Sequence, residues 1–213
     1  MINIINMNIK KIIIVAVLIV SFHALSAQTI EIVSPDYVWV GDTFTVNVTL
    51  NVTDSVGARF DLLFDNTILT GLSIDADLIN TTCSSNPYVS PLTGINNTSG
   101  KVIFEEVCLG GTVTGTGNIA VITFNATNAG ISNLNLENIK IKNTTGYDMP
   151  YTYTNNKTIT VKTCDLNNDG IIIHDYNDLI FSYKCFLGIE RNCKINYQDW
   201  KQIKEEYECF VGS

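Results

Sequence analysis

Apolar and polar residues alternate in short runs from Thr29 to about Val161, and Gly, Asn, Asp, Ser and Thr separate the runs. A period of two places successive side chains on opposite faces of a strand. In the run "TFTVNVTLN", one face carries Phe44, Val46, Val48 and Leu50, and the other carries Thr43, Thr45, Asn47, Thr49 and Asn51. The pattern predicts an all-β sandwich or barrel over residues 28–162, long enough to close one core.

The run "GARFDLLFDNTIL" follows the same rule. Its inward positions are Ala58, Phe60, Leu62 and Phe64, and its outward positions are Arg59, Asp61, Leu63 and Asp65. Further strands are predicted at Lys101 to Val107, Ile119 to Asn125, Leu134 to Ile141 and Thr158 to Val161. Glu105 and Glu106 are neighbours in one of these strands and point to opposite faces, so they do not form an acid–base pair.

After Thr163 the spacing becomes helical. Apolar residues recur at intervals of three and four in two groups, Tyr176, Leu179, Ile180 and Tyr183, then Trp200, Ile203 and Tyr207. The spacing predicts two short helices in a separate module of residues 163–213. Such a small module needs disulfides or a metal to hold it together.

Residues 1–27 have the order of a secretory signal peptide. Lys10 and Lys11 precede an apolar run from Ile12 to about Leu25, and the small residues Ser26 and Ala27 follow it. The run is shorter than the ~20 residues of a spanning helix, so cleavage near Ala27 is favoured over an uncleaved anchor. We therefore expect a secreted or cell-surface protein, with no membrane span after cleavage.

The charge balance excludes one class of partner. Without residues 1–27, 11 basic and 21 acidic residues remain, a net charge of about −10. Binding to nucleic acid needs clustered basic residues that neutralise phosphates, so a nucleic-acid partner is not expected.

All six cysteines follow the leader, and export makes disulfides the expected state. Cys83 in a polar loop is paired with Cys108 at the end of a strand. The remaining four allow three connectivities, of which the favoured one joins Cys164 with Cys209 and Cys185 with Cys193. The alternative, a zinc site, lacks the close C-x-x-C pairs that it usually has.

Eight Asn-x-Ser/Thr sequons precede residue 163, which predicts a glycoprotein in a host that glycosylates. They are at Asn47, Asn51, Asn80, Asn96, Asn97, Asn125, Asn143 and Asn156. The alternation of the first strand points both Asn47 and Asn51 to solvent.

The segment "DLNNDG" has the spacing of a calcium loop. Asp165, Asn167 and Asp169 occupy positions 1, 3 and 5, the carbonyl of Ile171 is at position 7, and Gly170 provides the sharp turn. Position 12 is Tyr176, with Asp175 one residue early. The alternative is an ordinary Asn/Asp-rich turn.

The segment "KINYQDWKQIKEEY" aligns with "IIIHDYNDLIFSY", so that Asp199 matches Asp175. This duplicated loop and helix resembles a divergent type I dockerin module. The resemblance implies that Asp175 completes the ligand set of one Ca²⁺. The second loop has Gly188, Glu190 and Asn192 where Asp, Asn and Asp belong, so one site is expected rather than two.

The preceding domain resembles a cohesin. The resemblance lies in "VWVGDTFTVNVTLNVTDSVGARFDLLFDNTILTGLSIDADLIN", "SGKVIFEEV" and "GNIAVITFNATNAGISNLNLENIKI". It implies a jelly-roll β-sandwich and a non-catalytic protein of cellulosome-type assembly, with an archaeal host as one option. The implied partners are dockerin- or cohesin-bearing proteins, including another copy of this chain bound head to tail.

The resemblance also implies an interface on one exposed sheet face. Arg59 and Asp61 on the sandwich, with Tyr197 and Gln198 on the module, are the candidate contacts, and a plain solvated side chain is the alternative for each. Gly57 and Arg59 stand where the family commonly has Asn and Asp, so partner choice does not transfer from better-known pairs.

Two other functions stay open. A carbohydrate-binding module, with polysaccharide as its ligand, would use surface aromatics such as Tyr37, Trp39, Tyr88, Tyr147, Tyr151 and Tyr153. A structural or adhesive surface protein would have no dedicated ligand. An enzyme is not expected, because His174 is the one histidine after the leader and a catalytic triad would have to be built around it.

Overall fold

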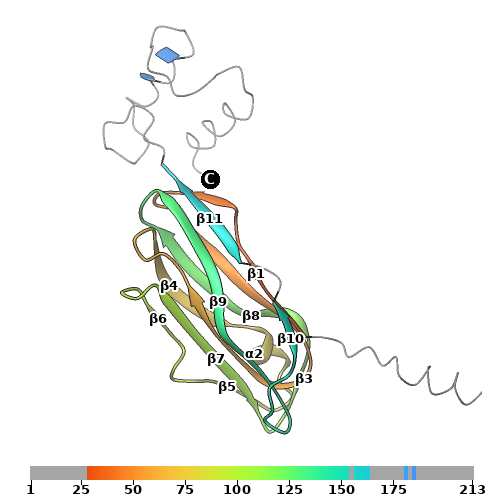
Figure 1. Cartoon of the computed structure of the whole chain (residues 1–213). Coiled ribbons are helices and arrows are strands. Elements are labelled where there is room, and N and C mark those ends of the chain that lie inside the picture. The colour runs from red at the N-terminus through yellow and green to blue at the C-terminus, as the bar shows by residue number, and fades with distance from the viewer. Residues whose placement is uncertain (1–27, 154–155, 164–179, 182–183, 186–213) are drawn as a thin grey trace, which may run out of the picture.

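The computed structural model describes residues 28–153, 156–163, 180–181 and 184–185 (Figure 1). In these ranges the elements are β1 (Gln28–Val33), β2 (Tyr37–Trp39), β3 (Thr43–Leu63), β4 (Leu69–Ala76), α2 (Leu78–Thr82), β5 (Asn86–Val89), β6 (Gly94–Asn96), β7 (Lys101–Leu109), β8 (Val113–Ala126), β9 (Gly130–Asn143), β10 (Tyr151–Tyr153) and β11 (Lys157–Lys162). The strands predicted from alternation are all present.

The long strand β3 belongs to both layers of the sandwich. Its first half pairs with β1 and β8, and its second half, from Ser55, pairs with β7 and β9. Asp54 has a φ of +56°, and the register shifts on both sides of Ser55. The chain therefore turns sharply at this point and runs back in the other layer. The sequence predicted the two halves of β3 as separate strands and did not place them in different layers.

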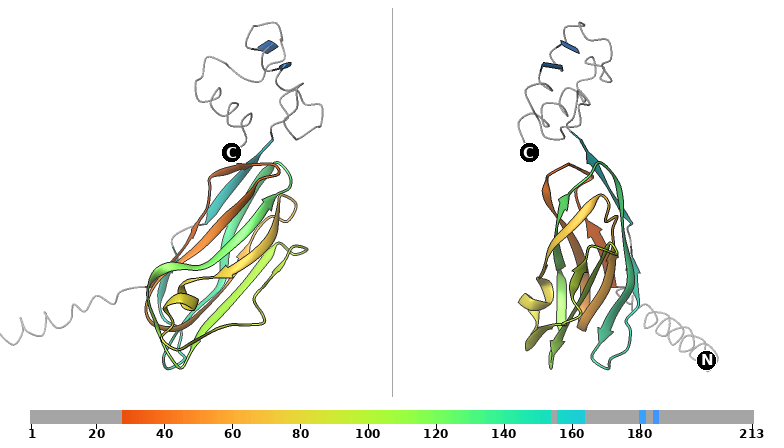
Figure 2. Two further views of the ribbon diagram at one scale, coloured as in Figure 1. Left: turned by 180° about the vertical axis from the view of Figure 1, so that it is seen from behind. Right: turned by 90° about the vertical axis from the view of Figure 1, so that its left-hand side faces the viewer.

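One layer runs β10, β1, the first half of β3, β8 and β4, and the other runs β9, the second half of β3, and β7, with β5 and β6 at its edge. The strand β11 pairs with the first residues of β9, and β2 pairs with β11. Figure 2 shows the layers from two further sides. Antiparallel strands with one face toward a shared core produce the alternation seen in the sequence.

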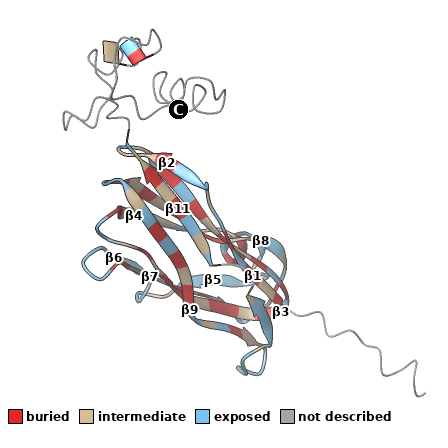
Figure 3. Cartoon of the chain, turned by 45° about the horizontal axis from the view of Figure 1, so that its top comes forward, coloured by how far each residue is buried: buried red, intermediate tan, exposed pale blue. Residues whose placement is uncertain are grey.

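The core lies between the layers and is almost wholly aliphatic and phenylalanine. Burial alternates along the strands, as Figure 3 shows. All inward positions predicted on β3 are buried, and the rings of Phe60 and Phe104 stack at 5.2 Å between their centroids. Aromatic contacts of this kind add to the free energy gained from area burial.

The predicted disulfide between Cys83 and Cys108 is confirmed, with a sequence separation of 25 residues. Closing a loop of that length stabilises the fold by about 3 kcal/mol in the chain-entropy model. It fastens the end of β7 to the C-terminal end of α2, a five-residue helix whose Leu78 and Ile79 are buried. The sequence did not predict α2, because five residues carry too little periodicity.

In the C-terminal module the structure describes Thr163 and four helical residues, Ile180, Phe181, Lys184 and Cys185. Cys185 is disulfide-bonded, and its partner is not among the described residues. The predicted leader, residues 1–27, lies outside the described part. No helix within that part is long and apolar enough to cross a membrane.

Candidate protein-binding face

The outward surface of the layer formed by β9, β3 and β7 carries a compact set of charged side chains. We call it the Arg59 face and define it by Arg59 and Asp61 of β3, Lys101 and Glu105 of β7, and Asn138, Lys140 and Lys142 of β9. The register of the three strands brings these residues together, because Arg59 pairs with Glu105 on one side and with Lys140 on the other.

Asp61 is the centre of this set and is only 4% exposed. Its Oδ2 accepts hydrogen bonds from Lys101 Nζ at 3.2 Å and from Asn138 Nδ2 at 2.8 Å, and its Oδ1 lies 3.9 Å from an Arg59 nitrogen. A buried carboxylate is tolerated when such charged and polar donors surround it. Asp61 therefore points outward as predicted, but it is covered by its neighbours.

Asn138 reaches Asp61 because β9 is irregular there. Its φ is +50°, and the β3–β9 register shifts between Arg59 and Asp61. Asparagine is among the few residues other than glycine that adopt this left-handed conformation readily. The irregularity thus turns a polar side chain toward the buried carboxylate.

Arg59 is held across the surface by a second acid. Its Nη1 donates to Glu105 Oε2 at 3.4 Å, and both side chains remain about one third exposed. An exposed pair of this kind contributes little to stability, so its main effect is to fix the direction of the guanidinium group. The guanidinium is left accessible to a partner.

Gly57 forms a notch beside Arg59. A Cβ at this position would lie 2.7 Å from the Glu106 carbonyl oxygen and 2.7 Å from Val107 Cγ1. Any larger residue would require β3 and β7 to shift apart. The depression has a volume of about 190 Å³, and its lining includes Lys140 and Lys142.

One end of the face is apolar. Tyr88 on the edge strand β5 pairs with Val107, and Tyr88 and Leu109 are about half exposed. Interfaces commonly combine an apolar centre with charged groups that fix orientation. The Arg59 face and its apolar end together offer both.

Glu106 lies directly beneath this face and is fully buried. Neither carboxylate oxygen has a hydrogen-bond partner among the described residues, and its neighbour across the strands is the small Ala58. Burial, with a smaller effect from the charge of Asp77, raises the pKa of Glu106 to about 7 from an ordinary 4.5. Alternation did place Glu106 inward, but a buried carboxyl was not predicted.

The basic residues of the sandwich are concentrated on this face. Residues 28–163 contain six, and Arg59, Lys101, Lys140 and Lys142 all lie on the Arg59 face, while Lys157 and Lys162 are on β11. The same residues include 12 acids. Acids lie among them: Arg59 and Lys101 pair with Glu105 and Asp61, Glu137 is opposite Asp61, and Lys142 pairs with Asp148 at 2.7 Å. The sandwich is acidic overall, and its cationic groups gather on this one surface, which favours a partner with acidic groups.

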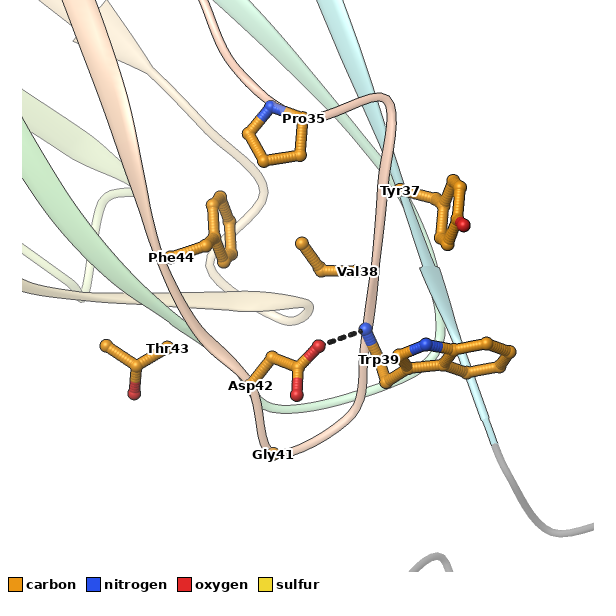
Figure 4. Close-up of a pocket in the computed structure, with 8 residues that line it drawn as sticks. All are labelled: Pro35, Tyr37, Val38, Trp39, Gly41, Asp42, Thr43 and Phe44. Carbon is orange, nitrogen blue, oxygen red and sulfur yellow. Dashed lines mark hydrogen bonds between the residues drawn. The ribbon is translucent and has the colours of Figure 1, made fainter. Parts of the chain in front are cut away.

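A larger hollow lies at the β2–β3 turn (Figure 4). It has a volume of about 700 Å³ and is lined by Pro35, Tyr37, Val38, Trp39, Gly41, Asp42, Thr43 and Phe44. The rings of Tyr37 and Trp39 meet edge to face at 81°, and Lys162 Nζ lies 4.2 Å and 5.6 Å from their centroids. The two rings are crossed and an ammonium group lies near both, so they do not form one flat pair.

The other aromatics considered for sugar binding are spread over the sandwich. Tyr88 is on β5, Tyr147 is in the turn after β9, and Tyr151 and Tyr153 are on β10. Tyr153 packs against the core, and its hydroxyl accepts a hydrogen bond from the Leu136 backbone at 3.2 Å. Tyr147 and Tyr151 remain exposed.

The candidate metal ligands Asp165, Asn167, Asp169, Ile171 and Asp175 lie outside the described residues, as do the contact candidates Tyr197 and Gln198 and the cysteines Cys164, Cys193 and Cys209. Within the described part, no three His, Cys, Asp or Glu residues gather as a metal site.

A family model described as "Cohesin domain" matches residues 29–167, which is well over half of the chain. The chain belongs to the cohesin family. No curated protein sequence matches it.

Solved cohesins share the fold. A non-cellulosomal cohesin from the archaeon Archaeoglobus fulgidus is 16% identical, with a TM-score of 0.53 over 66% of this chain and 94% of that one. A type II cohesin domain from the cellulosome of Acetivibrio cellulolyticus is 15% identical, with a TM-score of 0.54 over 62% and 95%. A type I cohesin–dockerin complex from Clostridium thermocellum is 16% identical, with a TM-score of 0.53 over 64% and 100%. The predicted cohesin-like sandwich is thus confirmed for the N-terminal region.

Proposed function

We propose that the cohesin domain binds a dockerin-type module through the Arg59 face, and that the chain is a non-catalytic protein of extracellular assembly. The observation that carries the proposal is the gathering of four of the six basic residues of the sandwich on this face. Structures of related cohesins in complex with dockerins support the class of partner.

The preorganised charges define how a partner is recognised. Asp61 is too deeply buried to touch a partner itself, and it positions Lys101, Asn138 and Arg59 around it. Arg59, Lys140 and Lys142 then offer cationic groups beside the Gly57 notch. Acidic side chains of a partner would lie here, while apolar side chains would cover Tyr88, Val107 and Leu109.

Residues 163–213 supply a module with the matching charge. They contain five basic and nine acidic residues. In the proposal this module is a dockerin that binds one Ca²⁺ through Asp165, Asn167, Asp169, the carbonyl of Ile171 and Asp175. The module of one copy binds the Arg59 face of the next, and a head-to-tail contact of this kind builds rings or open chains.

Calcium is expected to stabilise the module, because two short helices bury too little surface alone. Replacing Asp165 and Asp169 together by alanine should abolish the rise in melting temperature that calcium gives the full chain, measured by scanning calorimetry with and without a chelator. Asp178→Ala, which lies outside the predicted ligand set, is the control and should keep the rise. An unchanged calcium effect in the double variant would overturn the loop assignment.

A further inference from the structure

The eight sequons occupy very different surroundings in the folded sandwich. Modification of an asparagine joins Nδ2 to the anomeric carbon of a sugar, so a modified chain can reach the native fold and be secreted only where that fold leaves the nitrogen accessible. A sequon is therefore usable only where the side-chain amide is exposed and holds no structural hydrogen bond that the sugar would break.

Asn97 is the clearest case of a blocked sequon. Its Oδ1 accepts a hydrogen bond from the Gly71 backbone nitrogen at 2.8 Å, and its Nδ2 donates to the Gly71 carbonyl at 3.0 Å. Such a two-bond bridge uses the amide hydrogen on the same side as the oxygen, which is the position that a sugar takes in the planar secondary amide. Glycosylation of Asn97 would break this link between β4 and the β6–β7 connection.

Asn125 is blocked in a similar way. In the amide orientation that satisfies its neighbours, Nδ2 donates to the carbonyl oxygens of Asp42 and Gly41, at 3.2 Å and 3.3 Å. These contacts hold the β2–β3 turn against the end of β8. Asn47 also differs from the expectation of a solvent-directed side chain, because its Oδ1 is buried and has no partner among the described residues.

Asn51 and Asn80 differ from these sequons in the accessibility of their side-chain amides. Both residues are exposed, and neither side-chain amide makes a hydrogen bond to another described residue. Thr53 and Thr82, the third residues of their sequons, are exposed as well. Asn51 lies on the outward side of the first half of β3, between β1 and β8, and Asn80 lies on α2, which packs mainly against β8.

We propose that Asn51 and Asn80, which lie away from the Arg59 face, are N-glycosylated, and that Asn47, Asn97 and Asn125 are not. The donor is a lipid-linked oligosaccharide phosphate. The bond between Nδ2 and the sugar C1 forms as the bond from C1 to the phosphate oxygen breaks, and one amide proton passes to the base of the transferase.

The test is site mapping of the full chain secreted from yeast, whose transferase recognises Asn-x-Thr. Enzymatic release of the glycans in ¹⁸O-water converts each modified asparagine to labelled aspartate, which peptide mass spectrometry locates. Label at Asn51 and Asn80 is expected, without label at Asn47, Asn97 or Asn125. Label at any of those three, or an unlabelled Asn51 or Asn80, would overturn the proposal.

Two variants give an independent measurement. Asn51→Gln and Asn80→Gln should each lower the intact mass of the secreted protein by one glycan, because each removes one acceptor on an exposed surface. A variant that keeps the full glycan mass contradicts the assignment of that site. The peptide map of the unaltered chain does not depend on whether either variant folds.

Discussion

Replacing Lys140 and Lys142 together by glutamate is expected to weaken binding of the calcium-loaded module, residues 163–213, about 100-fold, or about 2.7 kcal/mol. The two side chains flank the Gly57 notch, and the change places like charges opposite an acidic partner. Isothermal titration calorimetry of the cohesin domain, residues 28–162, measures the effect. The affinity of the unaltered domain should also fall steeply with added salt.

Lys157→Glu is the matched control for these variants. Lys157 is on β11, where it pairs with the exposed Asp36 at 2.8 Å, and it lies outside the Arg59 face. It changes charge in the same direction but should leave the affinity within about twofold, the size of a minor surface effect. If the double variant and Lys157→Glu both bind as tightly as the unaltered domain, the Arg59 face is not the binding surface.

The free energy of unfolding of the cohesin domain is expected to be higher at pH 5 than at pH 8 because of Glu106. The folded state raises the pKa of Glu106 to about 7, above its ordinary 4.5. The stability that this group contributes is therefore fully present below pH 4.5 and is lost as the pH rises through 7. The difference is on the order of 3 kcal/mol.

Glu106→Gln should remove most of this pH dependence, because glutamine resembles the protonated acid and does not ionise. Urea unfolding at pH 5 and pH 8 measures it. Glu105→Gln, the neighbouring residue on the outer surface, is the control and should retain the dependence. The lowered pKa values of Asp36 and Asp65 act below pH 4, outside this window. Equal pH dependence in both variants would show that Glu106 is not its source.

Local alternation was sufficient to predict most of the sandwich. The inward and outward positions of β3 and β7 follow from a period of two, and the disulfide partners stand at recognisable loop and strand-end positions. That the two predicted strands on either side of Asp54 lie in different layers was not predictable in the same way, because local alternation does not report which strands pair.

The candidate face could be predicted only in part. Arg59 and Asp61 were placed outward, but the burial of Asp61 depends on Lys101 and Asn138, which are 40 and 77 residues away along the chain. The same register brings Lys140 and Lys142 beside Arg59. Contacts of this kind depend on strand pairing, and composition alone shows only a net acidic chain.

The central claim is that the cohesin domain recognises a calcium-loaded module of the kind found in its own C-terminal residues. Calorimetric titration of residues 28–162 with residues 163–213, in calcium at about 1 mM and then with a chelator, tests it most directly. The account predicts saturable binding in calcium and none after chelation. An absence of binding in calcium between two folded segments would contradict it.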